Sequence, residues 1–480
     1  MENYLMMQFF EWNVPNDGNH WERLRSAASH LNEMGYNRIW IPPCMKGSHQ
    51  DSTGYDVYDL YDLGEFMQKD TVRVRYGEKI ALKVAIDCLH SLNIQVIADV
   101  VLNHKAGADE TECFKVVEVR GDDRLNQISE PFDINGWTKF NFSGRGEVYS
   151  NFKWNFNHFT STDRDELNNR QGVFKILGEN KDFSHTVDTE NSNFDYLMFS
   201  DIDLNHTDVV NELKNWSAWF INELHIDGFR MDAIKHMDAN FVKLFFEHIR
   251  SQGNEEFFVV GEYWNPNLGK LQGYLEREDY DMHLFDVGLH YNFVEASQSG
   301  RDYDLSKILY DTLVSAKPMN AVTFVDNHDS QGGMYVGDWF KPISYALIML
   351  RYDGYPCIFY GDYYGISGEF PRTGFQEMID TLSYVRKSFA YGEQRDYFNH
   401  TNVIGWVRLG DEEHSNSGVA ILISNGDEGY KDMWFSPNFG GKIFYDIMGG
   451  RQETVTIEED GKGLFTVNPG SVSVWIEKIG

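Results

Sequence analysis

Eight short apolar runs of strand length recur between residues 4 and 360. They begin near residues 4, 38, 94, 226, 257, 282, 321 and 355. Between runs lie stretches whose apolar residues recur at helical spacing, such as Leu24, Ala28 and Leu31 after the first run. Strands that alternate with helices indicate a parallel sheet, and eight of them are enough to close a barrel. The sequence therefore predicts an α/β fold built on a (β/α)8 TIM barrel.

The alternating pattern is interrupted twice. The helix expected after His104 does not begin until about Thr207, and the intervening residues are rich in Asn, Asp, Gly and aromatics. After about residue 392 the runs become short, as in Val403–Val407, at a spacing typical of antiparallel strands. We expect a barrel in two parts (1–104 and 207–392), an inserted irregular β-rich domain after the third strand (105–206), and a C-terminal antiparallel β-sandwich domain (393–480).

Local signals place two boundaries within the barrel. Asn19, followed three residues later by Glu22, is typical of a capping box at the start of a helix. The apolar stretch from Met282 to Leu289 predicts a strand over its whole length.

Composition excludes several classes of partner. With 42 basic and 74 acidic residues, the net charge of −32 repels nucleic acid and anionic membranes. No apolar run has the length of a membrane span, and no basic segment of a signal peptide precedes the first run. The cysteines are too widely spaced for a zinc or redox motif: Cys44, Cys88, Cys113 and Cys357. We expect a soluble cytoplasmic protein with free thiols.

Acidic side chains stand where three of the runs end. They are Asp232, Glu262 and Asp329. In a parallel barrel the carboxyl ends of the strands converge on one cleft, so these groups should face one another. Crowded carboxylates cannot all ionise easily, and one of them tends to keep its proton at neutral pH. A carboxylic acid facing a carboxylate is the equipment for breaking a glycosidic bond.

Four segments around these strand ends carry a resemblance to a known family. They are Asp99-Val100-Val101-Leu102-Asn103-His104, Gly228-Phe229-Arg230-Met231-Asp232-Ala233-Ile234-Lys235-His236, Gly261-Glu262-Tyr263-Trp264 and Phe324-Val325-Asp326-Asn327-His328-Asp329. In these segments the chain resembles the α-amylases of the large retaining glycoside hydrolase family that cleaves α-glucans, in particular the bacterial liquefying and cytoplasmic α-amylases. The resemblance extends over essentially the whole chain.

The resemblance implies a role for each residue of the cleft. Asp232 would be the nucleophile, Glu262 the general acid and base, and Asp329 a third carboxylate that supports the distorted sugar. Arg230 would orient Asp232 and keep it ionised through charge-assisted hydrogen bonds. The remaining substrate-binding residues implied by the resemblance are Tyr55, His104, Lys235, His236 and His328.

A calcium site is the second expectation. Asn103, Asp195 and Asp201 offer the hard oxygen ligands that Ca²⁺ prefers, divided between the barrel and the insertion. From the sequence alone, the two aspartates are equally well explained as turn-forming residues. The resemblance supports the metal and adds the backbone carbonyl of His236 as a ligand.

The chain departs from secreted liquefying α-amylases at a further metal cluster. Those relatives carry several aspartates inside the insertion, and this chain has neutral residues at three of the aligned positions: Thr160, Ser184 and Asn205. Asp203 alone remains a carboxylate there. Neutral ligands cannot balance several clustered cations, so we expect one Ca²⁺ and no cluster.

The resemblance implies hydrolysis of internal α-1,4 bonds in starch, glycogen or maltodextrins, with retention at the anomeric carbon through a covalent intermediate. The Lys235-His236 pair favours α-1,4 chains over α-1,6 links. Two alternatives stay open: an α-glucanotransferase of the same family, which uses the same intermediate, and a non-catalytic glycan-binding relative, which would not need all three carboxylates. We expect a monomer whose partner is an α-glucan polysaccharide or maltooligosaccharide.

Overall fold

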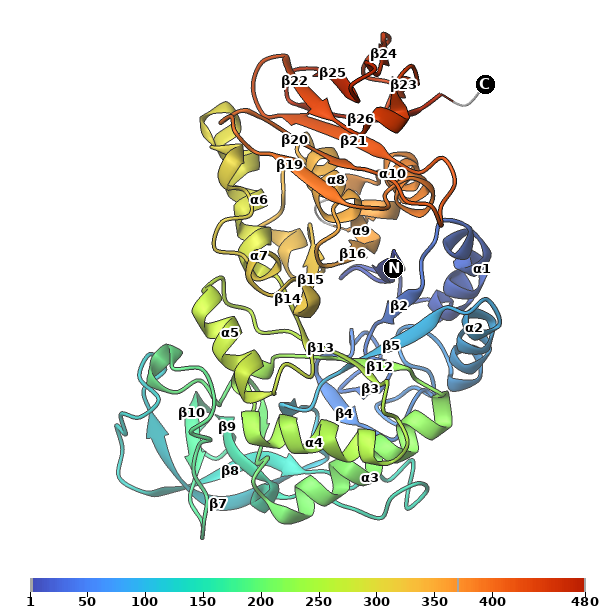
Figure 1. Ribbon diagram of the computed structural model, residues 1–480. Coiled ribbons are helices and arrows are strands. Elements are labelled where there is room, and N and C mark those ends of the chain that lie inside the picture. Colours follow the sequence, from blue (N-terminus) through green and yellow to red (C-terminus); the bar gives the residue numbers. More distant parts are fainter. Residues whose placement is uncertain (1–2, 369–370, 479–480) are drawn as a thin grey trace.

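Eight parallel strands close into a barrel in the computed structural model, which describes residues 3–368 and 371–478. All eight predicted runs are confirmed as barrel strands (Figure 1). In chain order they are β1 (Met6–Gln8), β2 (Arg38–Ile41), β5 (Gln95–Val100), β12 (Gly228–Met231), β13 (Phe258–Gly261), β14 (His283–Phe285), β15 (Ala321–Phe324) and β16 (Tyr355–Phe359).

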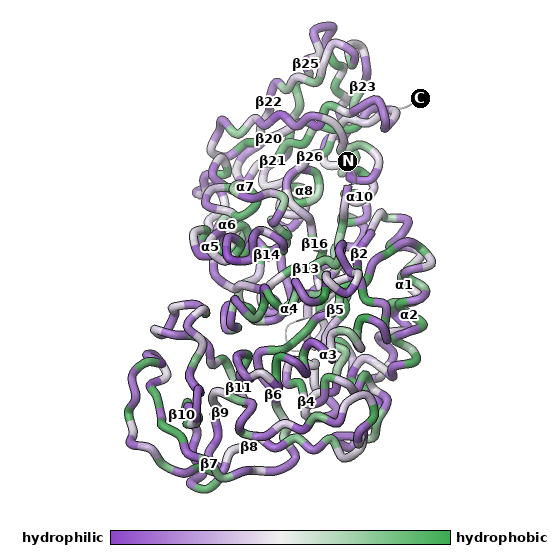
Figure 2. The backbone as a smooth tube through the Cα atoms, turned by 60° about the horizontal axis from the view of Figure 1, so that its bottom comes forward, coloured by the Kyte–Doolittle hydropathy of each residue, from purple (hydrophilic) through white to green (hydrophobic). Residues whose placement is uncertain are grey.

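The barrel strands are apolar on both faces because side chains fill the interior and helices cover the outside. Every residue of β12, β13, β15 and β16 is buried. Figure 2 shows hydrophobic segments along inner strands such as β5, and more hydrophilic ones along the outer loops. The main helices are α1 (His20–Glu33), α2 (Lys79–Ser91), α3 (Thr207–Leu224), α4 (Ala239–Ser251), α5 (Leu268–Arg277), α6 (Val287–Ser299), α8 (Lys341–Leu350) and α10 (Gln376–Ser388).

Two local boundaries differ from those expected. The Asn19 side chain forms no capping hydrogen bond, and Glu22 pairs instead with Arg25. The strand predicted to run to Leu289 ends at Phe285, because Asp286 caps α6 by accepting a hydrogen bond from the Leu289 amide at 3.1 Å. A side chain that satisfies the first free amides of a helix takes the residues after it out of the strand.

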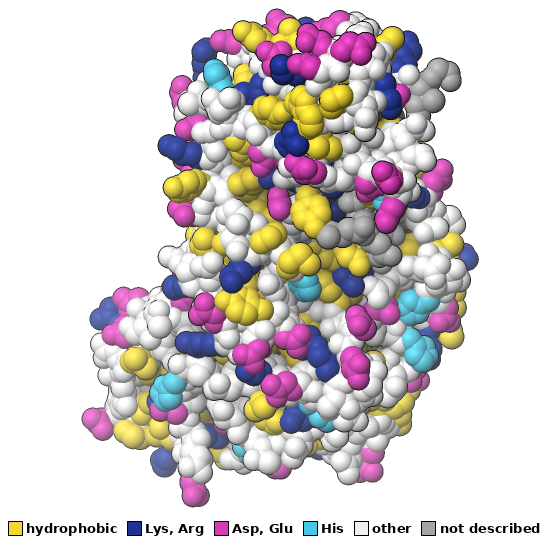
Figure 3. All heavy atoms as spheres, viewed as in Figure 1, with side chains coloured by type: hydrophobic (Ala, Val, Ile, Leu, Met, Phe, Trp, Pro, Cys, Tyr) yellow, Lys and Arg dark blue, Asp and Glu magenta, His cyan; other side chains and the backbone are white. Residues whose placement is uncertain are grey.

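The insertion is more regular than expected. Six antiparallel strands form one sheet in the order β6-β11-β9-β10-β7-β8. Their bounds are β6 (His104–Lys105), β7 (Glu110–Val119), β8 (Phe132–Lys139), β9 (Phe159–Asp165), β10 (Arg170–Ile176) and β11 (Ser200–Ile202). The sheet projects from the barrel at the lower left of Figure 1, and the molecular surface is indented where the two meet (Figure 3).

The C-terminal domain consists of two antiparallel sheets, as predicted. The larger has the order β19-β20-β21-β26-β23-β24 and the smaller pairs β22 with β25. The strands are β19 (Gln394–Tyr397), β20 (Val403–Arg408), β21 (Val419–Ser424), β22 (Gly429–Trp434), β23 (Ile443–Asp446), β24 (Thr454–Thr456), β25 (Lys462–Val467) and β26 (Ser471–Glu477). Both sheets contribute to one buried apolar cluster.

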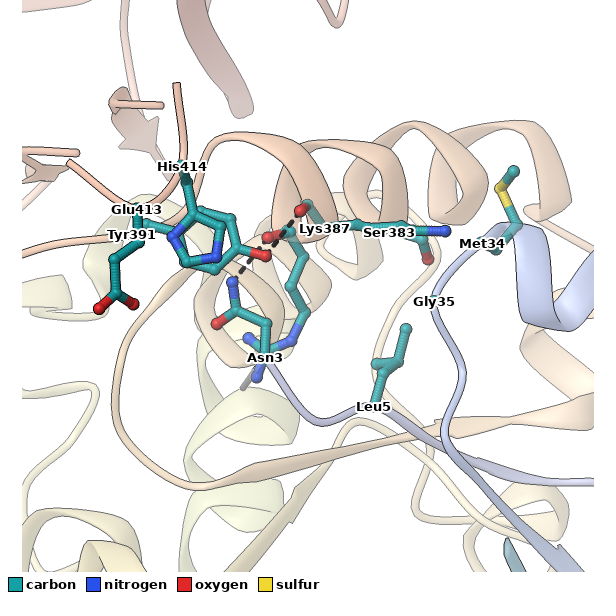
Figure 4. Close-up of a pocket in the computed structure, with 10 residues that line it drawn as sticks. Asn3, Leu5, Met34, Gly35, Ser383, Lys387, Tyr391, Glu413 and His414 are labelled. Carbon is teal, nitrogen blue, oxygen red and sulfur yellow. Dashed lines mark hydrogen bonds between the residues drawn. The ribbon is translucent and has the colours of Figure 1, made fainter. Parts of the chain in front are cut away.

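A cavity of about 300 Å³ lies at the seam between the start of the chain, α10 and the C-terminal domain (Figure 4). Tyr391 and His414 stack there with ring centroids 3.5 Å apart, beside Asn3. Asn3 precedes β1, so the cavity lies at the amino ends of the strands, where TIM barrels carry stabilising contacts rather than active sites. None of the helices in the described chain has the length and apolar character to cross a membrane.

Candidate active site

The three predicted catalytic carboxylates lie at one end of the barrel. Asp232 directly follows β12, Glu262 directly follows β13, and Asp329 lies five residues beyond the end of β15 (329 − 324). They share a cavity of about 390 Å³. Of the nine predicted catalytic and substrate-binding residues, eight line it: Tyr55, His104, Asp232, Lys235, His236, Glu262, His328 and Asp329. The ninth, Arg230, lies beneath its floor and is 1% exposed.

Arg230 connects the carboxylates. Its Nη1 atom donates to Asp232 Oδ1 at 2.6 Å and to Asp99 Oδ1 at 2.9 Å, while Nη2 lies 2.8 Å from Glu262 Oε2. The Ala233 amide also donates to Glu262 Oε2, at 3.0 Å. One planar guanidinium therefore holds Asp232 Oδ1 and Glu262 Oε2, and the second oxygen of each of these two acids makes no hydrogen bond within the described chain.

Asp99 also belongs to the site, although it is not among the site residues predicted from the sequence. It is fully buried near the end of β5, and its Oδ2 atom accepts hydrogen bonds from Trp40 Nε1 at 3.0 Å and from the Tyr55 hydroxyl at 2.9 Å. An aspartate inside an apolar strand run was the available signal, because a buried charge requires partners of this kind.

The electrostatic environment gives the two central acids, Glu262 and Asp232, different pKa values. Burial, together with the Asp232 and Asp329 carboxylates, raises the pKa of Glu262 to about 8 against the opposing effect of Arg230. Burial also raises the pKa of Asp232, but only to about 6, with Arg230 again opposing. At neutral pH, Glu262 therefore keeps its proton while Asp232 is mostly ionised. This is the division of roles between an acid and a nucleophile.

Aromatic rings form one wall of the cleft. Tyr55 stacks on His328 with centroids 5.1 Å apart and on Trp12 at 5.7 Å. Trp12 is 43% exposed and lines the cavity. It was not predicted from the sequence, because it lies in a loop without a recognisable motif. Flat exposed rings of this kind suit the apolar faces of sugars.

The two histidines present N–H groups in defined directions. His328 Nδ1 accepts from the Gln8 amide at 2.9 Å, which places the proton on Nε2, 3.5 Å from Asp329 Oδ2. His104 Nε2 donates to the Tyr55 carbonyl at 2.8 Å. Burial lowers the pKa of both His104 and His328 to about 4, so both rings are neutral at pH 7.

Lys235 and His236 contact the insertion. Lys235 Nζ lies 3.1 Å from Glu190 Oε2 and 3.3 Å from the Trp264 carbonyl. His236 Nδ1 donates to the Phe194 carbonyl at 2.7 Å. The segment after the nucleophile is therefore attached to the inserted domain.

The predicted calcium ligands lie together at the junction of insertion and barrel. Asn103, Asp195 and Asp201 are all buried, and Asn103 Nδ2 lies 3.4 Å from Asp201 Oδ1. Burial raises the pKa of Asp195 to about 8, to which Asp238 and Asp203 contribute. Burial and the neighbouring Asp195 likewise raise the pKa of Asp201. Buried carboxylates that repel one another fit the donor set of a hard divalent cation.

Lys181 fills the neighbouring region of the insertion. Its Nζ atom donates to the Asn157 and Phe159 carbonyls at 2.7 and 2.8 Å and lies 3.3 Å from Asp203 Oδ2. The side chain is 7% exposed. The Thr160 hydroxyl donates to Asp201, so it acts as a hydrogen-bond donor there. An ammonium group thus supplies the positive charge next to Asp203.

A group of possible metal ligands in the described chain comprises His158, His206 and Asp208. His158 Nδ1 accepts from the Asn155 amide at 3.1 Å, and His206 Nδ1 accepts from the Asp208 amide at 3.2 Å. Each ring therefore carries its proton on Nε2. Because a ligating histidine normally donates its second N–H to an acceptor, this arrangement fits helix capping better than metal binding.

Comparison with known proteins gives the family. Residues 21–402 match the family model of the α-amylase catalytic domain, and residues 419–476 match that of the α-amylase C-terminal domain. The chain belongs to the α-amylase family. It is accordingly a glycoside hydrolase.

Several α-amylase relatives align over nearly the full chain. The chain is 48% identical to the glucan 1,4-α-maltohexaosidase of Bacillus sp. (strain 707), covering 99% of this chain and 93% of the relative. It is 47% identical to the α-amylase of Bacillus licheniformis, with 99% and 94% covered. It is 41% identical to the cytoplasmic α-amylase of Escherichia coli (strain K12), with 99% of both covered.

Solved α-amylase structures share the fold. An Anoxybacillus α-amylase superposes with a TM-score of 0.64 at 18% identity, covering 100% of this chain and 98% of that one. An α-amylase from Malbranchea cinnamomea gives a TM-score of 0.64 at 14% identity, covering 99% and 96%.

Proposed function

We propose that this α-amylase-family enzyme hydrolyses internal α-1,4-glucosidic bonds of starch, glycogen or maltodextrins with retention at the anomeric carbon. The observation that carries the proposal is that one guanidinium, that of Arg230, holds both Asp232 and Glu262. Retaining enzymes have these carboxyl groups about 5–5.5 Å apart, whereas inverting enzymes leave about 6.5–9.5 Å for a water. Two acids on the adjacent nitrogens of one guanidinium favour the shorter separation.

The first step forms a bond between enzyme and sugar. The free Asp232 oxygen attacks the anomeric carbon while Glu262 gives its proton to the glycosidic oxygen, and the leaving chain departs as an alcohol. In the second step the Glu262 carboxylate takes a proton from water, the water oxygen attacks the anomeric carbon, and the Asp232 carboxylate leaves. Each step inverts the configuration at the anomeric carbon, so the product retains the configuration of the substrate.

The other cleft residues position the sugar. We assign the stacking wall of Tyr55 and Trp12 to the face of a glucosyl ring, and the N–H of His328 to one of its hydroxyls. Asp329, whose side chain is 44% exposed, supports the positive charge that develops on the sugar. Lys235 and His236 would contact the leaving-group side.

Two alternatives use the same site differently. Cyclomaltodextrin glucanotransferases match this chain at 24% identity, below the 41–48% of the amylases described above. A binding protein without activity would not require a neutral Glu262 beside an ionised Asp232. Hydrolysis is therefore the better-supported function.

We further propose one Ca²⁺ per chain, held by Asn103, Asp195, Asp201 and the backbone carbonyl of His236. The metal would neutralise the buried carboxylates and attach the insertion to the barrel. The position of Lys181 beside Asp203 supports a single ion without a cluster, because one cation already occupies that region.

We also propose a cytoplasmic monomer. All four cysteines are free, and one relative is itself named a cytoplasmic α-amylase.

Proton NMR of early hydrolysis products tests the function. Incubation with maltooctaose should first release the α-anomer of shorter maltooligosaccharides, and D232N should lose several orders of magnitude of turnover. Products longer than the substrate would show a glucanotransferase, and no turnover would show a binding protein. If D232N kept more than about a tenth of the rate, Asp232 would not be the nucleophile.

A further inference from the structure

A buried lysine without a role in the mechanism above lies beside the catalytic end of the barrel. Lys341 is the first residue of α8, and its side chain is 1% exposed. Its Nζ atom donates to Asp326 Oδ2 at 2.9 Å and to Asp362 Oδ1. Asp326 lies two residues beyond the end of β15 (326 − 324), and Asp362 lies in α9 (Tyr360–Tyr364), which directly follows β16. Because β15 and β16 pair as neighbours, one ammonium group joins the carboxyl ends of two adjacent strands (Figure 1).

The buried charges of Lys341, Asp326 and Asp362 satisfy one another. Against the opposing effect of burial, the two carboxylates raise the pKa of Lys341, so it stays charged at neutral pH. Neutral donors complete the set: Asp362 Oδ2 accepts from the Tyr345 hydroxyl at 2.7 Å, and Asp326 Oδ2 accepts from the Val336 amide at 3.2 Å. Any other arrangement would leave a buried charge unpaired, at a high cost in free energy. The cluster therefore forms a fixed anchor at the mouth of the barrel.

A path of hydrogen bonds leads from this anchor to the loop of the third catalytic carboxylate. Asp326 Oδ1 accepts from the Ser330 hydroxyl at 2.8 Å, and the oxygen of that hydroxyl accepts from the Asn327 amide at 3.0 Å. The Asn327 side chain accepts in turn from the amides of Asp329 and Ser330, at 3.0 and 2.9 Å. The backbone around Asp329 is thus held by side chains that are bonded to a partner of Lys341.

The Asp329 carboxylate depends on this loop for its position. Its side chain is 44% exposed, lies 3.5 Å from His328 Nε2 and makes no hydrogen bond within the described chain. Asp232 and Glu262, by contrast, are both held directly by Arg230. A carboxylate without such a partner lies where its backbone places it.

We propose that Lys341 is a positioning residue for hydrolysis: it joins Asp326 to Asp362 and thereby fixes the loop that carries Asp329. This proposal rests on the hydrolytic function proposed above, in which Asp329 supports the positive charge on the sugar. Displacement of that carboxylate would weaken a contact that matters most in the transition state. Loss of the anchor should therefore lower kcat more than it raises KM.

Two matched variants separate positioning from stability, because each removes one hydroxyl that donates to a carboxylate of the anchor. S330A breaks the path between Asp326 and Asn327, whereas Y345F removes the donor to Asp362, on the side of Lys341 away from Asp329. Both should lower the melting temperature by a similar amount. With maltooctaose, S330A should lower kcat about tenfold and K341M about 100-fold, each with KM changed less than about twofold. Y345F should keep the wild-type kcat.

A double-mutant cycle with D329N tests whether the anchor acts through Asp329. Maltosyl fluoride, which has a reactive leaving group, keeps the slow variants measurable. S330A and K341M should lower kcat in the wild-type background but by less than about twofold in D329N. S330A decides the test where K341M does not fold, because it leaves every buried charge paired.

Equal losses of kcat in both backgrounds would overturn the proposal, since a merely structural role does not depend on Asp329. A loss of kcat in Y345F as large as that in S330A would overturn it as well. Absence of maltooctaose hydrolysis by the wild type would instead refute the proposed function.

Discussion

At the scale of single residues, Arg230 determines the electrostatics of the cleft. A buried guanidinium offers fixed directions to several carboxylates at once, which a lysine could not do. Asp99 and Asp232 share one of its nitrogens, and Glu262 takes the other. Glu262 nevertheless has the higher pKa: burial raises it most, and the Asp232 and Asp329 carboxylates add to the effect of burial.

The pH dependence of kcat/KM follows from these two acids. Asp232 must be ionised, so activity should fall as the pH drops through about 6. Glu262 must keep its proton, and its raised pKa preserves that proton until the pH rises through about 8. We expect a bell-shaped profile with limbs near these values, measured with maltooctaose.

The variant E262Q tests whether the titration of Glu262 causes the fall in kcat/KM at high pH. With maltosyl fluoride, whose leaving group departs without a proton, E262Q should retain kcat/KM, which reports the first step, and show no fall in kcat/KM at high pH, whereas kcat should drop because no base activates water in the second step. A persistent alkaline limb in E262Q would mean that another group titrates there.

At the scale of elements, the position of the proposed calcium ligands depends on strand pairing across the insertion. Asn103 precedes β6 and Asp201 lies in β11, and Asp201 pairs with His104 in the antiparallel register. The ligands therefore meet only when the insertion closes on the barrel. Binding that requires the folded state stabilises it.

Metal content tests this arrangement. Elemental analysis after exhaustive dialysis should find one calcium per chain, and chelation should lower both the melting temperature and the activity. K181Q should lower the melting temperature but leave the metal content at one, because Lys181 neutralises Asp203 and binds no metal. Two or more metals in the wild type, or none together with indifference to a chelator, would contradict the single-site proposal.

At the scale of the whole molecule, the net charge and the burial of the four cysteine thiols bear on the cellular compartment of the protein. The net charge is −32, and acidic side chains are spread over all three domains on the face shown in Figure 3. Cys44 and Cys357 are buried, Cys88 is partly buried and Cys113 is exposed. Burial raises the pKa of Cys357 to about 12, which suppresses its reactive thiolate form.

Thiol labelling followed by mass spectrometry tests the compartment. In the native protein Cys113 should react first and Cys88 more slowly, whereas Cys44 and Cys357 should react only after denaturation. All four should be reduced in protein isolated from cells under alkylating conditions. A disulfide between any two of them would indicate export into an oxidising compartment.

The sequence by itself determined the barrel and the candidate catalytic acids. Strand runs and helical spacing are local patterns, and carboxylates at strand ends converge in any parallel barrel, so Asp232 and Glu262 could be selected without coordinates. Local patterns were weaker at boundaries. The Asn19 cap was wrong because the Tyr76 carbonyl accepts from the His20 and Trp21 amides at the start of α1, and the length of β14 was wrong because Asp286 caps α6.

Only the tertiary structure revealed the ion pairs of Arg230 with Asp99 and of Lys181 with Asp203. Asp99 lies 131 residues from Arg230 in the chain, and Lys181 lies 22 residues from Asp203. Electrostatic interactions depend on distance through space, which the order of residues does not record.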